Sequence, residues 1–194
     1  MIAIPSQSPK WTQPRVLPSS DAEMRKAELQ HDIDECAGAQ PRWDAVSRDA
    51  AAAESLVASE RRNYYQAGVL TMITINRESN RTLLEVARSL QDYEAGNSVK
   101  AKAEASKALQ ALDTIQKAMA AAEYGKWKNW YRGDWLTGVY RTRELVQNYA
   151  SHLADPMAKL PAPAAWSGWE AYFHIMEYED DRSVDVQPAS ANER

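Results

Sequence analysis

The chain contains few of the residues that usually carry chemistry or interrupt helices. Among its 194 residues there are one cysteine, one phenylalanine and seven glycines. The single thiol, Cys36, excludes an intramolecular disulfide and any zinc site built from several thiolates. Long apolar runs are also missing, since no stretch approaches the roughly 18 apolar residues of a membrane-spanning helix. We therefore expect no disulfide framework, no thiolate metal centre and no membrane partner.

Signals for secretion and for nucleic-acid binding are also missing. The first residues, MIAIPSQSPKW, have neither the charged start nor the apolar core of a secretory signal. We expect a cytoplasmic protein by default, and an extracytoplasmic one if the chain is a fragment of a secreted enzyme. The formal net charge is −4, from 23 basic and 27 acidic residues. This acidic balance argues against nucleic acid as a partner.

Motifs for catalysis or cofactor binding are equally scarce. The three histidines, His31, His152 and His174, lie far apart, and none has a second His or Cys at metal-ligand spacing. The sequence also lacks a glycine-rich phosphate loop and a supported Ser/His/Asp or Cys/His arrangement. We expect no metal and no cofactor, and we assign no catalytic residue. Glu123 with Asp134 is the one carboxylate pair that an enzymatic interpretation would test.

The residues that the chain has in abundance favour helices. Apolar residues make up 44% of the sequence, and much of that share is alanine. Long stretches of Ala, Glu, Lys, Leu and Arg have high helix propensity, and β-branched residues are few. No segment alternates apolar and polar residues between turn residues, as a half-buried strand does. We predict an all-α fold.

Proline, glycine and capping residues divide the chain into segments. Four prolines predict an extended lead-in over residues 1–20. A first helix is predicted over 21–36, because glycine and proline follow at positions 38 and 41. A second helical stretch over 43–96 is unusually long for a compact domain, so a break or kink is predicted near 59–63. Further helices are predicted over 98–124, with Ser98 as the cap and Gly125 as the stop, and over 134–155.

Apolar residues recur at spacings of three and four within these segments, which predicts core-facing helix sides. Three polar residues, Asn76, Ser79 and Asn80, interrupt the stripe of the second stretch. Hydrogen bonds across the bundle are the favoured explanation, and a bend of the helix or a polar partner are the alternatives. The predicted core positions are Tyr65, Val69, Met72, Ile73, Leu83, Val86, Ala87, Leu90, Val99, Leu109, Leu112, Ile115, Met119, Ala122, Trp135, Leu136, Val139, Leu145, Val146, Tyr149 and Leu153.

Short connections set the predicted topology. Loops at 96–97 and 125–133 make consecutive helices antiparallel neighbours. We therefore predict an up-and-down bundle of four to five helices over residues 21–182. It lies between an extended proline-rich N-terminal segment over 1–20 and a polar, frayed C-terminal tail over 183–194.

The segment from Tyr124 to Arg143, YGKWKNWYRGDWLTGVYRTR, differs in composition from the rest of the chain. It holds three of the seven tryptophans, together with tyrosines and five basic residues. Tyr and Trp rings have large apolar faces and a polar tip, so they favour positions between a packed side and a wet side. From Trp135 onward the segment belongs to the predicted core. The residues left to bind a ligand are Trp127, Trp130, Tyr131, Arg132 and Asp134.

Two interpretations of these residues stay open. In a binding site, the flat rings contact the apolar faces of sugar rings, while Arg132 and Asp134 form directional hydrogen bonds. In a structural role, which is the more common one, the same rings cover the open end of the bundle or pack on an adjacent domain. Base stacking uses similar residues, but the acidic net charge argues against it.

Three features of the central segment resemble a known family. Tyr64-Tyr65 lies in the long second stretch, Asn76 follows on the same helix, and Gly125–Trp127 ends the next helix. In order and spacing, this resembles the helical bundle that follows the catalytic barrel of glycoside hydrolase family 115 enzymes, the xylan α-glucuronidases. The resemblance covers roughly residues 60–140. Because the chain lacks the alternating strands and helices of a barrel, no catalytic residue carries over.

The resemblance implies a non-catalytic helical accessory module of a carbohydrate-active enzyme. Its aromatic and basic loop would face a catalytic glycosidase domain or a polysaccharide. The module would not be catalytic by itself, and if it is part of an enzyme, that enzyme would be a glycoside hydrolase. The alternative is a stand-alone helical interaction or scaffold protein whose aromatic cluster is structural core.

Overall fold

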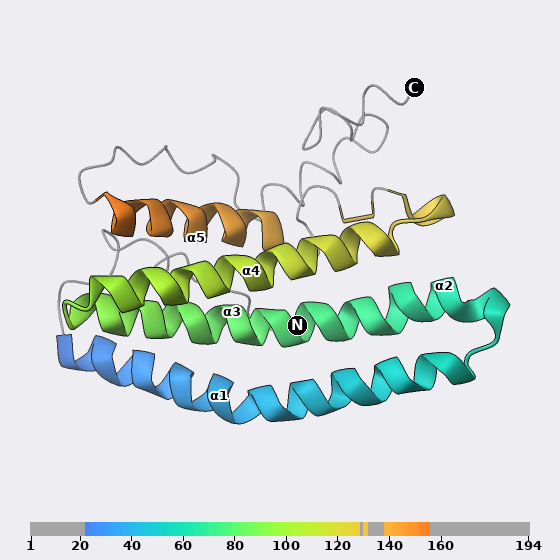
Figure 1. Ribbon diagram of the computed structural model, residues 1–194, viewed down its shortest axis with the longest axis horizontal. Helices are drawn as coiled ribbons and strands as arrows, with labels where there is room; N and C mark the ends of the chain where they lie inside the picture. Colours follow the sequence, from blue (N-terminus) through green and yellow to red (C-terminus); the bar gives the residue numbers. More distant parts are fainter. Residues whose placement is uncertain (1–21, 129, 132–137, 156–194) are drawn as a thin grey trace, which may run out of the picture.

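All regular elements of the described chain are helices. The computed structural model describes residues 22–128, 130–131 and 138–155. Four long helices, α1 (Ala22–Ala53), α3 (Thr71–Glu94), α4 (Ser98–Ala122) and α5 (Val139–Ala154), run along the long axis as antiparallel neighbours (Figure 1). The predicted all-α, up-and-down bundle is confirmed for this part of the chain. Residues 1–20 and 183–194 lie outside the described residues.

Helix α1 continues through both residues that were predicted to end it. Gly38 and Pro41 lie inside the helix, although an interior proline removes one helical hydrogen bond. Helix α3 supports this region, because Asn80 Nδ2 donates to the Cys36 carbonyl oxygen and to Gln40 Oε1, both at 2.9 Å. These contacts come from residues about 40 positions away, which local sequence signals do not record. The predicted boundary between the first two helices is wrong.

The chain reverses direction at a later point, in a hairpin after α1. Two 3₁₀ turns, η4 (Glu54–Leu56) and η5 (Ser59–Arg61), make the reversal and lead into the short helix α2 (Arg62–Tyr65). The break predicted near residues 59–63 is confirmed. The Tyr65 hydroxyl donates to the Ala50 carbonyl oxygen at 2.9 Å and so ties the two arms of the hairpin together.

A π-helical segment, η6 (Gln66–Leu70), joins α2 to α3 and changes which residues face the core. A π-helical turn inserts an extra residue and rotates the residues on its two sides relative to one another. Met72, a predicted core position, is exposed as a result, and Tyr65 is only partly buried. Val99, which was predicted to face the core from α4, is also exposed, because it lies in the first turn of that helix. The buried face of α3 includes six polar residues: Thr71, Glu78, Ser79, Thr82, Glu85 and Ser89.

Helices α3 and α4 pack closely against each other. Ser89 Oγ donates to the Ala101 carbonyl oxygen at 2.6 Å, and Thr71 Oγ1 donates to the Ala118 carbonyl oxygen at 3.4 Å. Bonds from short side chains to the backbone of the other helix require the two backbones to lie near each other. Small residues on α4 permit this approach, and the buried ones are Ala101, Ala105, Ala108, Ala111 and Ala122.

A glycine and a cap residue mark the turn between α3 and α4. Gly96 has a φ of +78°, in the left-handed region that favours glycine, and it ends α3 as predicted. Asn97, rather than the predicted Ser98, occupies the N-cap position of α4. Its carbonyl oxygen accepts the N–H of Ala101 at 3.0 Å. The N-cap of α4 is thus one residue earlier than predicted.

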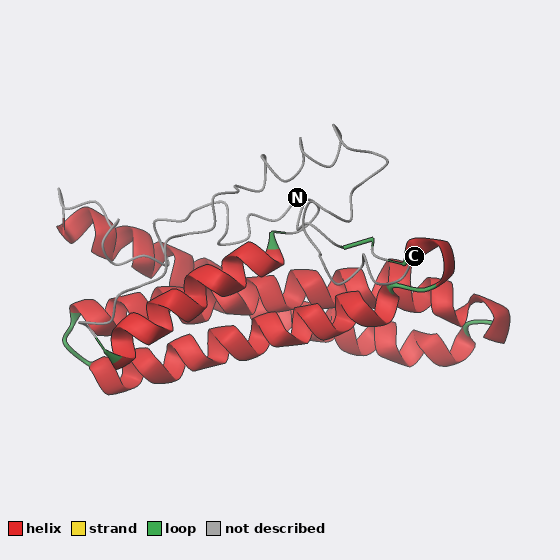
Figure 2. Ribbon diagram, turned by 90° about the horizontal axis from the view of Figure 1, so that it is seen from above, coloured by secondary structure: helices red, strands yellow, loops and turns green. Residues whose placement is uncertain are grey.

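Helix α5 covers only one half of the bundle, the half remote from the hairpin (Figure 2). Its Tyr149 hydroxyl lies 2.9 Å from Ser89 Oγ, and its Arg143 Nε donates to Asp113 Oδ1 at 2.8 Å. The predicted apolar side of α5 is confirmed. The buried residues of this part of the core include Val86, Leu90, Leu112, Val139, Val146 and Leu153.

The bundle therefore has two unlike halves. We call residues 29–36, 81–113 and 138–155 the covered half, because α5 packs on α3 and α4 in this part of the bundle. Residues 37–80 and 114–131 form the hairpin half. From position 37 to position 70 no residue is buried, and the contacts between α1 and α3 in this half are largely polar.

Candidate functional site

The aromatic segment after α4 lies at the same end of the bundle as the hairpin (Figure 1). Helix α4 ends at Ala122, and η7 (Gly125–Trp127) forms a single 3₁₀ turn. Gly125 has a φ of +52°, which favours glycine at this position. The Trp130 N–H then donates to the Trp127 carbonyl oxygen at 3.0 Å. The local backbone thus places two tryptophans three residues apart on one tight turn.

Trp127 and Trp130 form an edge-to-face pair. Their ring centroids are 4.9 Å apart, and the ring planes are inclined by 88°. This geometry places the positive edge of one ring against the negative face of the other. Trp130 is 41% exposed, whereas Trp127 is partly buried. Within the described residues the aromatic contact is a pair rather than a larger cluster.

Tyr131 anchors this loop in the core. It is only 7% exposed and belongs to the main hydrophobic core. Its backbone N–H donates to Glu123 Oε1 at 2.7 Å. Burial, followed by the nearby Glu123 carboxylate, raises the pKa of the Tyr131 hydroxyl. The ring of Tyr131 therefore has little surface to offer a ligand, and Glu123 holds the loop in place.

The two charged residues predicted beside the rings, Arg132 and Asp134, lie outside the described residues. The Glu123–Asp134 carboxylate pair is therefore described only at Glu123. Two basic residues of the segment form ion pairs on α5. Arg141 Nη1 donates to Glu144 Oε2 at 2.9 Å, and Arg143 pairs with Asp113 of α4.

Two exposed apolar residues at the same end were not predicted as site residues. Leu56, in the η4 turn, is 85% exposed, and Tyr64, on α2, is 70% exposed. Tyr64 Cε1 lies 3.9 Å from the position that a Cβ atom on Gly68 would take, so the ring leans along the helix. Their exposure was not predictable from local patterns, because it depends on the chain reversal between α1 and α2.

Two of the three polar residues predicted on the buried stripe form internal hydrogen bonds. Asn80 bonds across to α1, as described above, which confirms that prediction for this residue. Asn76 Nδ2 donates to the Met72 carbonyl oxygen within its own helix, at 2.8 Å. Ser79 Oγ is buried and has no hydrogen-bond partner.

A buried carboxylate that sequence reasoning missed lies next to Ser79. Glu78 is almost fully buried, and Arg77 Nε donates to its Oε1 at 2.8 Å. Arg81 Nη1 lies 3.3 Å from Oε2 of the same carboxylate. Arg77 Nη1 also donates to Ser47 Oγ of α1 at 2.9 Å. Both oxygens of Glu78 are engaged, so this group joins α1 to α3 rather than offering a base to a substrate.

The two histidines that the structure describes lie apart from each other. His152 lies in the last turn of α5, where its Nε2 is 3.5 Å from the Tyr93 hydroxyl and the two rings meet edge-on. His31 is exposed on α1, and His174 lies outside the described residues. Among the residues that the structure describes, no three His, Cys, Asp or Glu side chains come together as metal ligands would.

Cys36 is buried in the core. Burial and the carboxylates of Asp32 and Glu35 raise the pKa of its thiol to about 11. The thiol therefore stays protonated at neutral pH, and a protonated buried thiol is a poor nucleophile.

Comparison of the chain with protein-family models, curated proteins and solved structures found no match. In the part of the chain that the structure describes, the helices are too short or too polar to cross a membrane.

Proposed function

We propose that the chain is a non-catalytic helical module that binds a partner through Trp127 and Trp130. The observation that supports this most strongly is the exposed position of Trp130, whose ring is held edge-to-face on Trp127. Aromatic residues of this kind contribute much of the binding energy where they meet a partner. A ring that is already fixed by a neighbour loses less side-chain entropy on binding.

The loop that carries the two tryptophans is held at both ends. Glu123 follows directly on α4 and accepts the N–H of Tyr131, and Tyr131 is buried in the core. The tryptophans lie between these two fixed points. The binding surface is therefore part of the rigid bundle rather than a loose connection, which favours recognition of a defined shape.

The leading partner class is carbohydrate, presented as a polysaccharide or within the cleft of a catalytic glycosidase domain. Tryptophan faces complement the C–H faces of sugar rings, and the resemblance to the accessory bundle of xylan α-glucuronidases gives the same expectation. The exposed Lys128 lies between the two tryptophans in sequence and adds positive charge to an otherwise acidic chain. An acidic sugar polymer fits this combination better than a neutral one.

A protein surface is the second candidate, and Leu56 and Tyr64 favour it. These two residues add exposed side chains at the same end of the bundle as the tryptophan turn. Large exposed apolar side chains of this kind mark protein interaction sites more often than sugar sites. In this case the chain is an interaction or scaffold module, and the tryptophans form one side of a broader contact.

Tryptophan fluorescence tests the sugar hypothesis directly. Titration with xylan and with acidic and neutral oligosaccharides should shift or quench the emission, and Trp130→Ala should remove most of the response. Val99→Ala is the matched control, because Val99 is exposed at the opposite end of α4. No response of the wild-type protein to a broad panel of sugars would contradict the carbohydrate assignment.

A double variant distinguishes a sugar ligand from a protein partner. The double substitution Leu56→Ser with Tyr64→Ser should leave sugar-induced quenching unchanged if the tryptophan turn acts alone. It should weaken binding to a co-expressed glycosidase domain if the whole hairpin end is the contact. If neither Trp130→Ala nor the double variant changes any binding that is measured, the proposed surface is wrong.

A further inference from the structure

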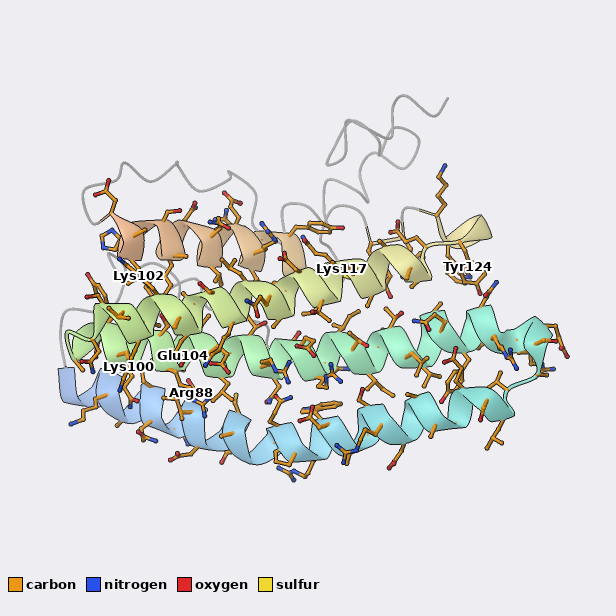
Figure 3. All side chains as sticks on the ribbon, viewed as in Figure 1. Arg88, Lys100, Lys102, Glu104, Lys117 and Tyr124 are labelled. Carbon is orange, nitrogen blue, oxygen red and sulfur yellow. The ribbon has the colours of Figure 1, made fainter. Side chains whose placement is uncertain are left out.

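We propose that Glu85 of α3 and Glu104 of α4 share one proton and form a pH-sensitive latch between these helices. The latch lies in the covered half, and it is independent of the binding surface at the hairpin end. Figure 3 shows Glu104 near Arg88 of α3, where α3 and α4 run side by side.

The register of the two helices brings the carboxyl groups together. The bond from Ser89 to Ala101 and the bond from Thr71 to Ala118 fix the antiparallel pairing. In this register, the residue numbers of two facing positions on α3 and α4 add up to about 190. Glu85 therefore faces position 104 or 105, so its carboxyl group lies within reach of the Glu104 carboxyl group.

Glu85 lacks the partners that a buried carboxylate needs. The residue is 7% exposed, and its Oε2 is buried with no hydrogen-bond donor within reach. Arg88 Nη1 is 3.6 Å from Oε1, which is too far for a hydrogen bond. A buried, unpaired charge of this kind is costly. Protonation removes the charge and supplies a hydrogen that Glu85 can donate to Glu104.

Glu104 is well placed to remain the charged member of the pair. Lys107 Nζ donates to both of its oxygens, at 3.0 and 2.8 Å. The hydrogen bond from Glu85 lowers the pKa of Glu104, and Lys107 lowers it further. The assignment of the proton to Glu85 and of the negative charge to Glu104 follows from this asymmetry.

The pKa of Glu85 supports the shared proton. Burial first, and then the bond to Glu104 and the negative charge of Glu104, raise the pKa of Glu85 from 4.5 to about 7. The charged groups that oppose this shift are Arg88 on α3 and Lys107 on α4. Because two carboxyls in contact titrate as a pair, the midpoint near neutrality belongs to the pair as a whole.

The sign of the pH effect follows from linkage. The folded protein holds the Glu85 proton more tightly than the unfolded chain, so this contribution to stability is complete below about pH 4.5. It declines as the pH rises and is lost above about pH 7. At higher pH two carboxylates face each other across the helix pair, and this repulsion loosens α3 from α4.

Carboxyl-detected NMR measures the proton itself. One glutamate signal of the wild-type protein should titrate near pH 7, and it should be absent from Glu85→Gln. The amide of this variant can still donate to Glu104 but cannot ionise. If every glutamate of the folded protein titrates in the ordinary acidic range, the shared proton does not exist.

Hydrogen exchange measures how the opening of α3 from α4 depends on pH. Between pH 5.5 and 7.5, after correction for intrinsic exchange, opening of the α3–α4 amides should increase about tenfold in the wild-type protein. Glu85→Gln should remove this increase, and Glu104→Gln should reduce it, because its amide can donate to an ionised Glu85. Glu35→Gln, on the exposed face of α1, is the control and should keep the wild-type response. An equal increase in Glu85→Gln would overturn the proposal.

Discussion

The covered half and the hairpin half of the bundle use the same kind of helix in different ways. In the covered half, α5 lies over α3 and α4, and side chains such as Leu90 and Leu112 are fully buried. In the hairpin half no residue between positions 37 and 70 is buried, and polar contacts connect α1 to α3. Apolar burial contributes more to stability than polar contacts near the surface do.

We infer from this difference that the covered half supplies most of the free energy of folding. The hairpin half exposes Leu56, Tyr64 and Trp130, the side chains on which the proposed binding depends. Segments with few buried apolar contacts open at lower free energy than the core. We therefore expect substitutions in the two halves to have very different consequences.

Leu90→Ala should have the largest effect. Leu90 is fully buried on α3 in the covered half, so truncation loses apolar burial and leaves a cavity. The expected loss is about 2–5 kcal/mol in the free energy of unfolding. Chemical denaturation measures it, and a loss below about 1 kcal/mol would mean that the covered half does not dominate stability.

Asn80→Ala should weaken the hairpin half without disturbing the covered half. The change removes two hydrogen bonds to α1 and leaves the Cys36 carbonyl and Gln40 without this donor. We expect a loss of about 1–2 kcal/mol, seen as faster hydrogen exchange in α1 beyond Cys36. Exchange that increases equally in α5 would show that the two halves are not separable.

Tyr149→Phe tests a single polar contact inside the covered half. The hydroxyl of Tyr149 contacts Ser89, which keeps its bond to the Ala101 carbonyl oxygen after the substitution. Because one partner remains satisfied, the expected cost is only about 1 kcal/mol. Thermal or denaturant unfolding measures it, and a cost as large as that of Leu90→Ala would contradict the dominance of apolar burial.

Leu56→Ala should have the smallest effect on stability. Leu56 is 85% exposed in the hairpin, so its truncation should change the free energy of unfolding by less than about 0.5 kcal/mol. If the hairpin end binds a protein, the same variant should weaken that binding. A clear loss of stability would instead place Leu56 in the core of the hairpin.

The apolar periodicity predicted the parts of the fold that burial controls. Val86 and Leu90 on α3, Leu112 on α4, and Val146 and Tyr149 on α5 are buried as expected. Their spacing of three and four determines a helix face whatever the partner helix is. The C-terminal ends of α3 and α5 were predicted within two residues, from the turn residues that follow them.

The first two helices were not predictable from local signals. Glycine and proline ordinarily end a helix, yet α1 continues because Asn80 of α3 supports it near Cys36. The π-helical segment shifted the core face of the next helix, so Met72 became exposed. Both effects depend on contacts or backbone geometry that the local sequence does not contain.

The surroundings of the proposed site residues could be predicted only in part. The tryptophans of the aromatic segment were identified by composition, and Trp130 is exposed. The burial of Tyr131 depends on a contact with Glu123 eight residues earlier and on the core beneath it. The Glu85–Glu104 pair joins different helices, and its unusual pKa arises only from burial in the folded state.

Residue-resolved hydrogen exchange under native conditions tests the division into two halves most directly. We predict that amides of α3 and α4 around Leu90 and Leu112 exchange only through global unfolding. Amides of α1 from position 42 to position 53 should exchange through local opening at a distinctly lower free energy. Equal protection in both segments would contradict the account, because the hairpin half would then be as firmly held as the core.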